Sequence, residues 1–195
     1  MNSTKTYLPK DFIHTTARCR LRIVSEADIP LVFSASRYPG FNNGMLWDPP
    51  ASIEELRTPL EKSLQAWEQG TSYYFSIDAH SGEFLGRISI RGTDATSVWN
   101  IGFWTHPTQQ GKGFMSEAAE AVIGIGFDTL NAERIEACYA TWNIASKKVL
   151  EKIGMSFVKH IPEGFKKRGE WVAEDLMAIE KAHWMENKGG PKEPA

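Results

Sequence analysis

Two glycines between a strand-like segment and a helix-like segment give the sequence its first sign of chemistry. Gly111 and Gly113 follow Gln110 and flank Lys112, and a helical pattern of apolar residues begins at Met115. The first amides of a helix lack partners within the helix, and the helix dipole adds partial positive charge there. Glycines let this backbone approach a phosphate closely, and Gln110 adds an amide donor. The turn predicts an anion site, although glycines are also common in ordinary strand-to-helix connections.

The familiar phosphate loops do not account for this turn. In a P-loop a glycine leads the pattern and a serine or threonine follows the lysine, but His106 and Gly113 occupy those positions here. The glycine pattern that binds dinucleotides is also missing from the sequence. A ligand can therefore be assigned to the turn only with help from a second part of the chain.

The second part is a polar segment that starts at Asn143 and ends at Gly154 and Met155. Asn143 is a favourable helix cap, and Ser146 falls in the first turn of that helix. Gly154 is placed to end the helix. Taken alone, this pattern predicts a short capped helix and no chemistry.

Taken together, the two segments resemble the GNAT superfamily of acetyltransferases. Its signature, Gln/Arg-x-x-Gly-x-Gly/Ala, corresponds to Gln110-Gly-Lys-Gly113-Phe-Met115, with Met115 in place of a small residue. Further motifs are typical of the Rim-type branch, which acetylates protein N-termini, and follow in the expected order: Ile101-Gly102-Phe103-Trp104, Ser116-Glu117-Ala118, Arg134-Ile135-Glu136-Ala137 and Asn143…Ser146…Gly154-Met155. The resemblance is close from Val98 to Met155 and looser from Arg18 onward.

The hydrophobic pattern predicts an α/β (α+β) fold with a mixed, mostly antiparallel sheet. Alternating or β-rich runs predict about seven strands, over Cys19–Val24, Tyr73–Ala79, Glu83–Arg91, Val98–Thr105, Arg134–Ala140, Met155–Lys159 and Glu170–Glu180. Helical spacing predicts about four helices, with apolar faces near Ile29–Phe33, Leu56–Trp67, Met115–Leu130 and Ser146–Ile153. The resemblance implies the GNAT fold, whose sheet is splayed in the middle, here between Val98–Thr105 and Arg134–Ala140.

The resemblance also implies acetyl-CoA as co-substrate, with no metal. The pantetheine arm is expected in the splay, bonded to backbone at Phe103, Trp104 and Thr105. The pyrophosphate is expected on the turn formed by Gln110, Gly111, Lys112, Gly113, Phe114 and Met115. Asn143 is expected to orient the arm, and Ser146 to donate a proton to the departing thiolate. These two are the expected catalytic residues.

The general base is where the sequence departs from the Rim-type pattern. Many enzymes of that branch have glutamate immediately before Ile-Gly, but Asn100 stands there and cannot accept the amine's proton. Asn100 is instead expected to bind substrate or water. The sequence offers other candidates for the base without placing any of them: Glu55, Asp48, Glu83 and His106. Trp47, in a loop rich in Gly, Asn and Pro, is the expected acceptor contact, although it fits a core position equally well.

These features predict an acetyl-CoA-dependent N-acetyltransferase in which a primary amine attacks the thioester directly. Positioning both reactants can contribute about 7–11 kcal/mol. An α-amine titrates at about 7.7–8.0 and a lysine amine at about 10.4, so a missing carboxylate base favours the α-amine of a protein N-terminus. Two alternatives remain open. One is acetylation of a small amine such as a polyamine, amino acid or antibiotic, and the other is a sensor domain that binds acyl-CoA without catalysis.

Composition predicts one domain that works in the cytoplasm. Residues 1–186 are expected to form it, with 1–16 as a loose lead-in and 187–195 as a disordered tail rich in Gly, Pro and Lys. A net charge of −2 gives no footprint for nucleic acid, and no apolar run approaches the ~20 residues of a membrane span. Cys19 and Cys138 lack metal-ligand spacing, so neither a metal site nor a disulfide is expected. A homodimer is an expectation from the resemblance alone.

Overall fold

The computed structural model describes residues 7–188, which form one mixed sheet flanked by helices. Its strands are β1 (Ile13–Thr15), β2 (Cys19–Ile23), β3 (Ser72–Ala79), β4 (Phe84–Gly92), β5 (Val98–Thr105), β6 (Arg134–Ala140), β7 (Ser156–Lys167) and β8 (Glu170–Glu180). The strands lie side by side in the order β1-β2-β3-β4-β5-β6-β8-β7. All neighbours are antiparallel except β5 and β6.

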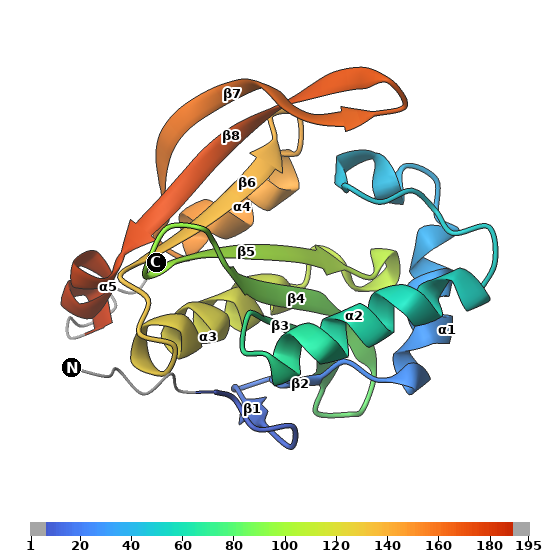
Figure 1. The fold of residues 1–195 in the computed structure, drawn as a ribbon, viewed down its shortest axis with the longest axis horizontal. Helices are drawn as coiled ribbons and strands as arrows, with labels where there is room; N and C mark the ends of the chain where they lie inside the picture. Colours follow the sequence, from blue (N-terminus) through green and yellow to red (C-terminus); the bar gives the residue numbers. More distant parts are fainter. Residues whose placement is uncertain (1–6, 189–195) are drawn as a thin grey trace.

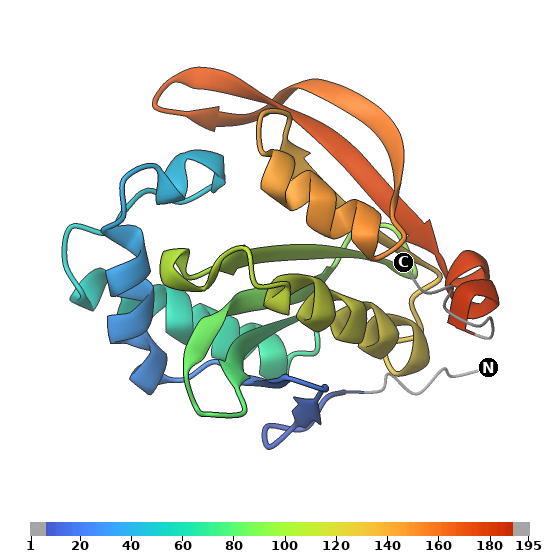
Figure 2. The same cartoon turned by 180° about the vertical axis from the view of Figure 1, so that it is seen from behind.

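Helices cover both faces of this sheet. They are α1 (Ile29–Ser36), α2 (Arg57–Glu68), α3 (Phe114–Asp128), α4 (Ile144–Lys152) and α5 (Lys181–Lys188), joined by the short 3₁₀ turns η1 (Glu26–Asp28), η2 (Phe41–Gly44), η3 (Glu54–Leu56) and η4 (Pro107–Gln109). Figure 1 shows α2 in front of the sheet, and Figure 2 shows α3 and α4 on the opposite face. None of the helices in the described part of the chain has the length and hydropathy to span a membrane.

The predicted mixed, mostly antiparallel sheet is confirmed, but the counts differ. The described residues form eight strands and five α-helices, where the sequence predicted about seven and four. The additional strand, β1, lies within the predicted lead-in. It was not predicted because three residues are too few to show an alternating pattern. The additional helix, α5, follows β8 directly and includes residues 187 and 188 of the expected tail. Residues 1–6 and 189–195 lie outside the described residues.

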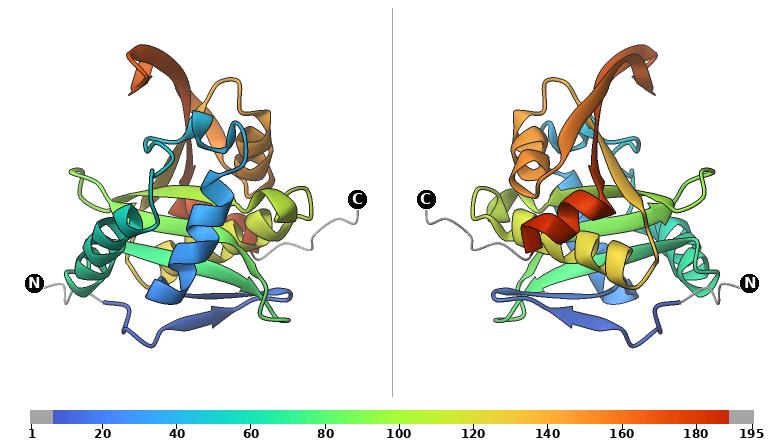
Figure 3. Two further views of the ribbon diagram at one scale, coloured as in Figure 1. Left: turned by 90° about the vertical axis from the view of Figure 1, so that its right-hand side faces the viewer. Right: turned by 90° about the vertical axis from the view of Figure 1, so that its left-hand side faces the viewer.

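The sheet opens between β5 and β6. These strands pair in parallel only at their first three positions, Val98 with Arg134, Trp99 with Ile135 and Asn100 with Glu136. On its other side, β5 pairs with β4 from Trp99 to Thr105. The backbone from residue 101 to residue 105 therefore has no strand partner on the β6 side. Figure 1 shows β6 and β8 rising away from β5, and Figure 3 shows the same separation from the side, which confirms the splayed sheet.

Close packing of α3 fixes where the splay begins. Val122 and Ile123 of α3 are fully buried in the main core. At Gly126 a Cβ would stand 2.7 Å from Ile135 Cδ1 of β6 and 2.8 Å from Ile90 Cδ1 of β4. Only glycine allows this approach, which places the helix over both halves of the sheet. Each buried Ile contributes about 1.5–3 kcal/mol, so the junction is held by packing although few strand pairs cross it.

Candidate active site

A cavity of about 1500 Å³ occupies the splay and continues on both sides of it. Its walls include β5, the turn before α3, the start of α4 and the loop that follows α1. Most small-molecule pockets measure roughly 300–1,000 Å³, so this one has room for a large cofactor and an acceptor together. Of the residues predicted for the site, it is lined by Trp47, Asn100, Phe103, Trp104, Thr105, Gln110, Gly111, Gly113, Phe114, Met115, Asn143 and Ser146.

The turn before α3 requires its two glycines for backbone reasons. Gly111 has φ +75° and Gly113 has φ +78°, both in the left-handed region, and Gly113 caps α3. A Cβ on Gly111 would meet no atom within 4 Å, so the backbone there is open to the cavity. Lys112 is the exception among the predicted residues. It does not line the cavity, and its Nζ donates to Gln109 Oε1 at 2.8 Å.

An ion pair from the N-terminal strands braces this turn. Arg18 donates from Nη1 to the carbonyl of Lys112 at 3.0 Å and pairs through Nε with Glu117 Oε2 at 2.6 Å. Glu117 also accepts from the Thr16 hydroxyl at 2.6 Å and from the Arg18 backbone N–H at 2.7 Å. Desolvation by burial raises the pKa of Glu117, but these hydrogen bonds outweigh it and the pKa lies below its usual value. Ionised Glu117 thus ties the first turn of α3 to the chain before β2.

Replacing Glu117 with glutamine is expected to lower the free energy of unfolding by about 1–3 kcal/mol near neutral pH, the usual scale for hydrogen bonds to a charged group. Because the folded pKa is depressed, this stabilisation is present above the unfolded pKa of about 4.3 and is lost as pH falls through the folded value. Urea denaturation of both proteins at about pH 7 and pH 3.5 checks this. An equal difference at both pH values would contradict the role of the charge.

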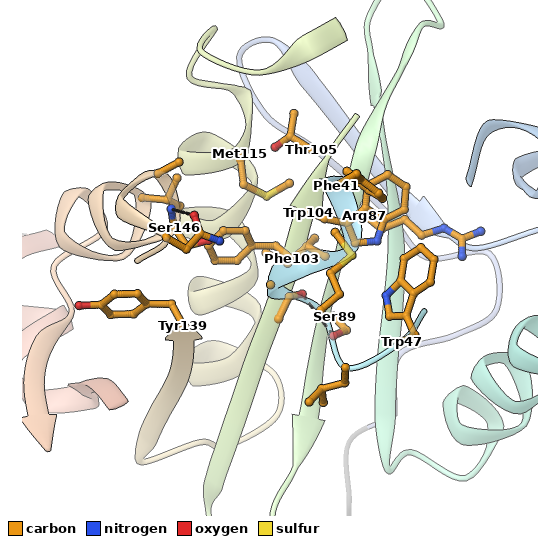
Figure 4. A pocket seen from close by; sticks show the side chains of 18 of the residues that line it. Phe41, Trp47, Arg87, Ser89, Phe103, Trp104, Thr105, Met115, Tyr139 and Ser146 are labelled. Atoms are coloured by element: carbon orange, nitrogen blue, oxygen red, sulfur yellow. Dashed lines mark hydrogen bonds between the residues drawn. The ribbon is translucent and has the colours of Figure 1, made fainter. Parts of the chain in front are cut away.

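The start of α4 brings two predicted residues to one side of the splay. Asn143 caps the helix by accepting a hydrogen bond at Oδ1 from the Ser146 backbone N–H at 3.1 Å. The Ser146 side chain lines the cavity. Figure 4 shows the Phe103 ring directed across the opening toward Ser146. Lys148 and Lys152, one turn apart on α4, also line the cavity and were not predicted.

The other side of the splay is lined by aromatic and basic residues. Trp104 packs edge-on against Phe41, with ring centroids 5.3 Å apart, and Phe41 packs against Trp47 at 6.2 Å. Figure 4 shows Trp47 and Arg87 on this side, away from Ser146. Asn100 accepts a hydrogen bond from Arg91 Nη2 at 2.8 Å, which fixes the amide. Trp47, which fitted either a pocket or the core, lies in the cavity wall.

Arg87 brings a buried positive charge to this wall, with a long ion pair to Asp28. Its Nε and Nη2 atoms are buried without a hydrogen-bond partner among the described residues, and the nearest acid, Asp28, lies 3.8 Å away. Asp28 already accepts bonds from Arg22, Ser25 and Ser76. Burial lowers the pKa of Arg87 to about 10, so the side chain stays cationic near neutral pH.

Lys167, at the end of β7, fastens the Trp47 loop over the cavity. Its Nζ donates to the carbonyls of Met45 at 3.0 Å and Trp47 at 2.8 Å, and it pairs with Asp48 at 2.8 Å. The Lys167 side chain is only 11% exposed. Across the same opening, the loop at Gly44 lies against Trp142 and Asn143, within 3.3 Å of where a Cβ would stand. The loop is thus held from both β7 and α4.

Each of the four suggested bases is either already bonded to a neighbouring group or outside the cavity lining. Asp48 is paired with Lys167, and Glu55 accepts from the backbone of Ala51 at 2.9 Å. Glu83 does not line the cavity and accepts a hydrogen bond from Gln109. His106 also lies outside the lining, where its Nδ1 is hydrogen-bonded to Thr108 at 2.8 Å. The remaining cavity carboxylate is Glu174 of β8, which the sequence analysis did not single out.

The family described as Acetyltransferase (GNAT) domain matches residues 18–156 of this chain. The uncharacterized N-acetyltransferase YnaD of Bacillus subtilis strain 168 is 40% identical over 104 residues, which is 51% of this chain and 59% of that protein. The chain thus aligns with less than two thirds of the length of this relative.

Solved structures share the fold at lower identity. RimL, a ribosomal L7/L12 alpha-N-protein acetyltransferase solved with coenzyme A, superposes with a TM-score of 0.79 at 18% identity over 87% of this chain and 98% of that one. A spermidine N-acetyltransferase from Vibrio cholerae, solved with CoA and spermine, gives 0.76 at 18% identity over 87% and 99%. Likeness at this identity shows the fold alone, and the two proteins act on different amines.

Proposed function

We propose that this chain, which belongs to the GNAT family of acetyltransferases, transfers an acetyl group from acetyl-CoA to the α-amine of a protein N-terminus. One observation carries the proposal. A single cavity joins the unpaired backbone of β5, the left-handed glycine turn before α3 and the Asn143–Ser146 start of α4. These are the three elements that a thioester, a pantetheine arm and a pyrophosphate require.

The residues present fit acetyl-CoA. The backbone of residues 101–105 is free on the β6 side to pair with an amide-containing arm, as a neighbouring strand would. The amides at the start of α3 are suited to bind an anion, and no atom lies within 4 Å of where a Gly111 side chain would begin. Lys148 and Lys152 add positive charge along the same wall. When bound, acetyl-CoA supplies a thioester carbonyl that an amine can attack.

The chain's own contribution is positioning and proton transfer. Amides of β5 that face the splay donate to the negative charge that develops on the carbonyl oxygen. Asn143 fixes the first turn of α4 by capping it, so the Ser146 side chain is held in the cavity wall. From there Ser146 donates a proton to the sulfur as the carbon–sulfur bond breaks.

Replacing Ser146 with alanine is expected to lower kcat only about 3–10-fold, below the usual ~10²–10⁴-fold for general acid catalysis. The reason is that a free thiol titrates near about 8.5, so the thiolate leaves without much assistance. Stopped thiol-release assays measure this, with Ser34→Ala, at an exposed position of α1 outside the cavity lining, as the control. An unchanged kcat in Ser146→Ala would remove the residue from the mechanism.

The charge on the acceptor side favours an α-amine over a polyamine. A polyamine needs several carboxylates, but residues 7–188 contribute only three to the cavity lining, and Asp48 is neutralised by Lys167. Arg87 and Arg91 line the same wall and repel a polycation. An α-amine is partly neutral near pH 7 because its pKa is about 7.7–8.0, whereas a lysine amine is not.

Calorimetry with acetyl-CoA, followed by thiol release with a panel of amines, tests the proposal. The panel contains peptides with a free N-terminus, peptides whose free amine is a lysine, spermidine and amino acids. Turnover highest on the N-terminal peptides is the expected result. Equal turnover of lysine peptides near pH 7 would overturn the α-amine assignment, and binding without turnover of any amine would favour an acyl-CoA sensor.

A further inference from the structure

Glu174 reaches the splay because β8 lies next to β6. It pairs with Ala140 across the strands, on the face that carries Cys138 two residues earlier in β6. Both Glu174 and Cys138 line the cavity. Desolvation and then the charge of Glu174 raise the pKa of the Cys138 thiol to about 11, so the carboxylate acts directly on this part of the wall.

A bulge in β7 makes room for this side chain. The register of β7 against β8 is interrupted between Ile161 and Phe165, and Gly164 lies inside the interruption. A Cβ on Gly164 would stand 2.5 Å from Glu174 Cγ and 2.7 Å from Oε2. Any larger residue would displace the carboxylate. The glycine and the bulge therefore fix where the Glu174 side chain lies.

No other group in the described chain neutralises Glu174. It forms no ion pair and accepts no side-chain hydrogen bond among residues 7–188, in contrast to Asp48 with Lys167 and Glu55 with the Ala51 amide. Desolvation by burial is the sole cause that shifts the pKa of Glu174, and it raises that pKa. An unpaired carboxylate with a raised pKa in a cavity is the usual form of a general base.

We propose that Glu174 is the general base of the acetyl transfer, in place of the glutamate that Asn100 replaces. This inference rests on the proposed function. The acceptor ammonium gives one proton to the Glu174 carboxylate, and its nitrogen lone pair then forms the bond to the thioester carbon. The carbon–sulfur bond breaks, sulfur takes the electron pair and Ser146 protonates it. The nitrogen, positively charged after the attack, loses its second proton to solvent, and Ser146 is reprotonated from solvent. Glu174 afterwards returns its proton to solvent, so one proton is released for each acetyl group transferred.

The surroundings of Glu174 agree with this role. Other charged groups near this wall, which also act on Cys138, are Glu136 of β6, Lys159 of β7 and Arg91 of β4. Arg91 is bonded to Asn100, and Glu136 to Arg134 at 2.7 Å. Glu174 thus remains the carboxylate available to an incoming ammonium. The free-energy cost of proton transfer to a carboxylate is smaller from an α-amine, with a pKa of about 7.7–8.0, than from a lysine amine, with a pKa of about 10.4.

The test is Glu174→Gln, which keeps the shape of the side chain and removes the base. The expected result is a loss of about 100-fold or more in kcat on an N-terminal peptide, with acetyl-CoA affinity by calorimetry unchanged. In wild type the rate levels off below the amine's pKa. In Glu174→Gln it keeps rising with pH up to the amine's pKa, because only amines that are already neutral react. Glu170→Gln, at the exposed far end of β8, is the matched control.

The outcomes separate this inference from the proposed function. Wild type that turns over no amine overturns the proposed function. Active wild type with Glu174→Gln within about 3-fold of it, or with an unchanged pH profile, overturns Glu174 as the base. If Glu174→Gln fails to bind acetyl-CoA or unfolds, Glu174→Asp decides. Aspartate keeps a carboxylate on a shorter side chain, so Glu174→Asp should show the wild-type pH profile at a reduced rate. A pH profile that differs from that of wild type would also overturn the proposal.

Discussion

Valine in place of Gly111 is expected to raise the Kd for acetyl-CoA about 10–100-fold. The loss comes from the backbone, because the left-handed φ of +75° is poorly accessible to a β-branched residue. The turn would shift toward another conformation and withdraw amides from the pyrophosphate. Each hydrogen bond to a charged group is worth about 1.5–3 kcal/mol, which corresponds to the stated range. Isothermal calorimetry measures the affinity directly.

Gly82→Val provides the matched control for this prediction. Gly82 has φ +88° in the turn between β3 and β4, and a Cβ there also meets nothing within 4 Å. Both variants should lose about 1–2 kcal/mol of stability from backbone strain. Only Gly111→Val should lose acetyl-CoA affinity. A similar loss of affinity in both variants would mean that the turn before α3 has no special part in binding.

Methionine in place of Lys167 is expected to raise the KM for the acceptor about 10–50-fold while leaving acetyl-CoA affinity unchanged. Removing the ammonium abolishes two hydrogen bonds to loop carbonyls and the ion pair with Asp48. Methionine keeps the apolar stem, so packing is preserved. The Trp47 loop would then be ordered only at the expense of binding energy from the acceptor. Steady-state kinetics with an N-terminal peptide gives the value.

Lys166→Met is the neighbouring control. Lys166 is exposed and lies over the Trp171 ring at 4.9 Å, on the same hairpin but away from the loop. Its acceptor KM should stay within about 2-fold of wild type, because a cation–π contact at an exposed site is worth about 0.5–1 kcal/mol. If Lys167→Met behaved in the same way, the fastening of the loop would be irrelevant to acceptor binding.

The features that sequence reasoning captured are those with local causes. A glycine turn before a helix and an asparagine cap depend on neighbouring residues, and both lie where they were predicted. The strand over Glu170–Glu180 was also predicted at its observed bounds, since the residues that define it are contiguous in the chain. Strand β1 was not predicted because its three residues show no clear alternating pattern, and their extended conformation depends on pairing with β2.

Glu174 and Lys167 were missed because their positions are not local. Glu174 is far from Asn100 in the chain and reaches the cavity only because β8 inserts between β6 and β7. One signal was available: Glu174 and Asp175 together interrupt the apolar residues of a strand otherwise suited to burial. Nothing comparable marks Lys167, whose partners are backbone carbonyls from a loop on the opposite side of the opening. Conversely, Lys112 carried a local signal and yet faces Gln109.

The three residue pairs that join β5 to β6 have a consequence for how the molecule unfolds. Strands β2–β5 and strands β6–β8 are each joined by five or more register pairs between neighbours, so among these strands the β5–β6 junction has the fewest. Hydrogen exchange should be fastest, among the central strands, at amides of β5 that face the junction. A ligand whose arm lies along β5 would supply backbone hydrogen bonds that β6 does not make to β5. At about 100 times its Kd it would add about 2.7 kcal/mol, turning two loosely coupled halves into one cooperative unit.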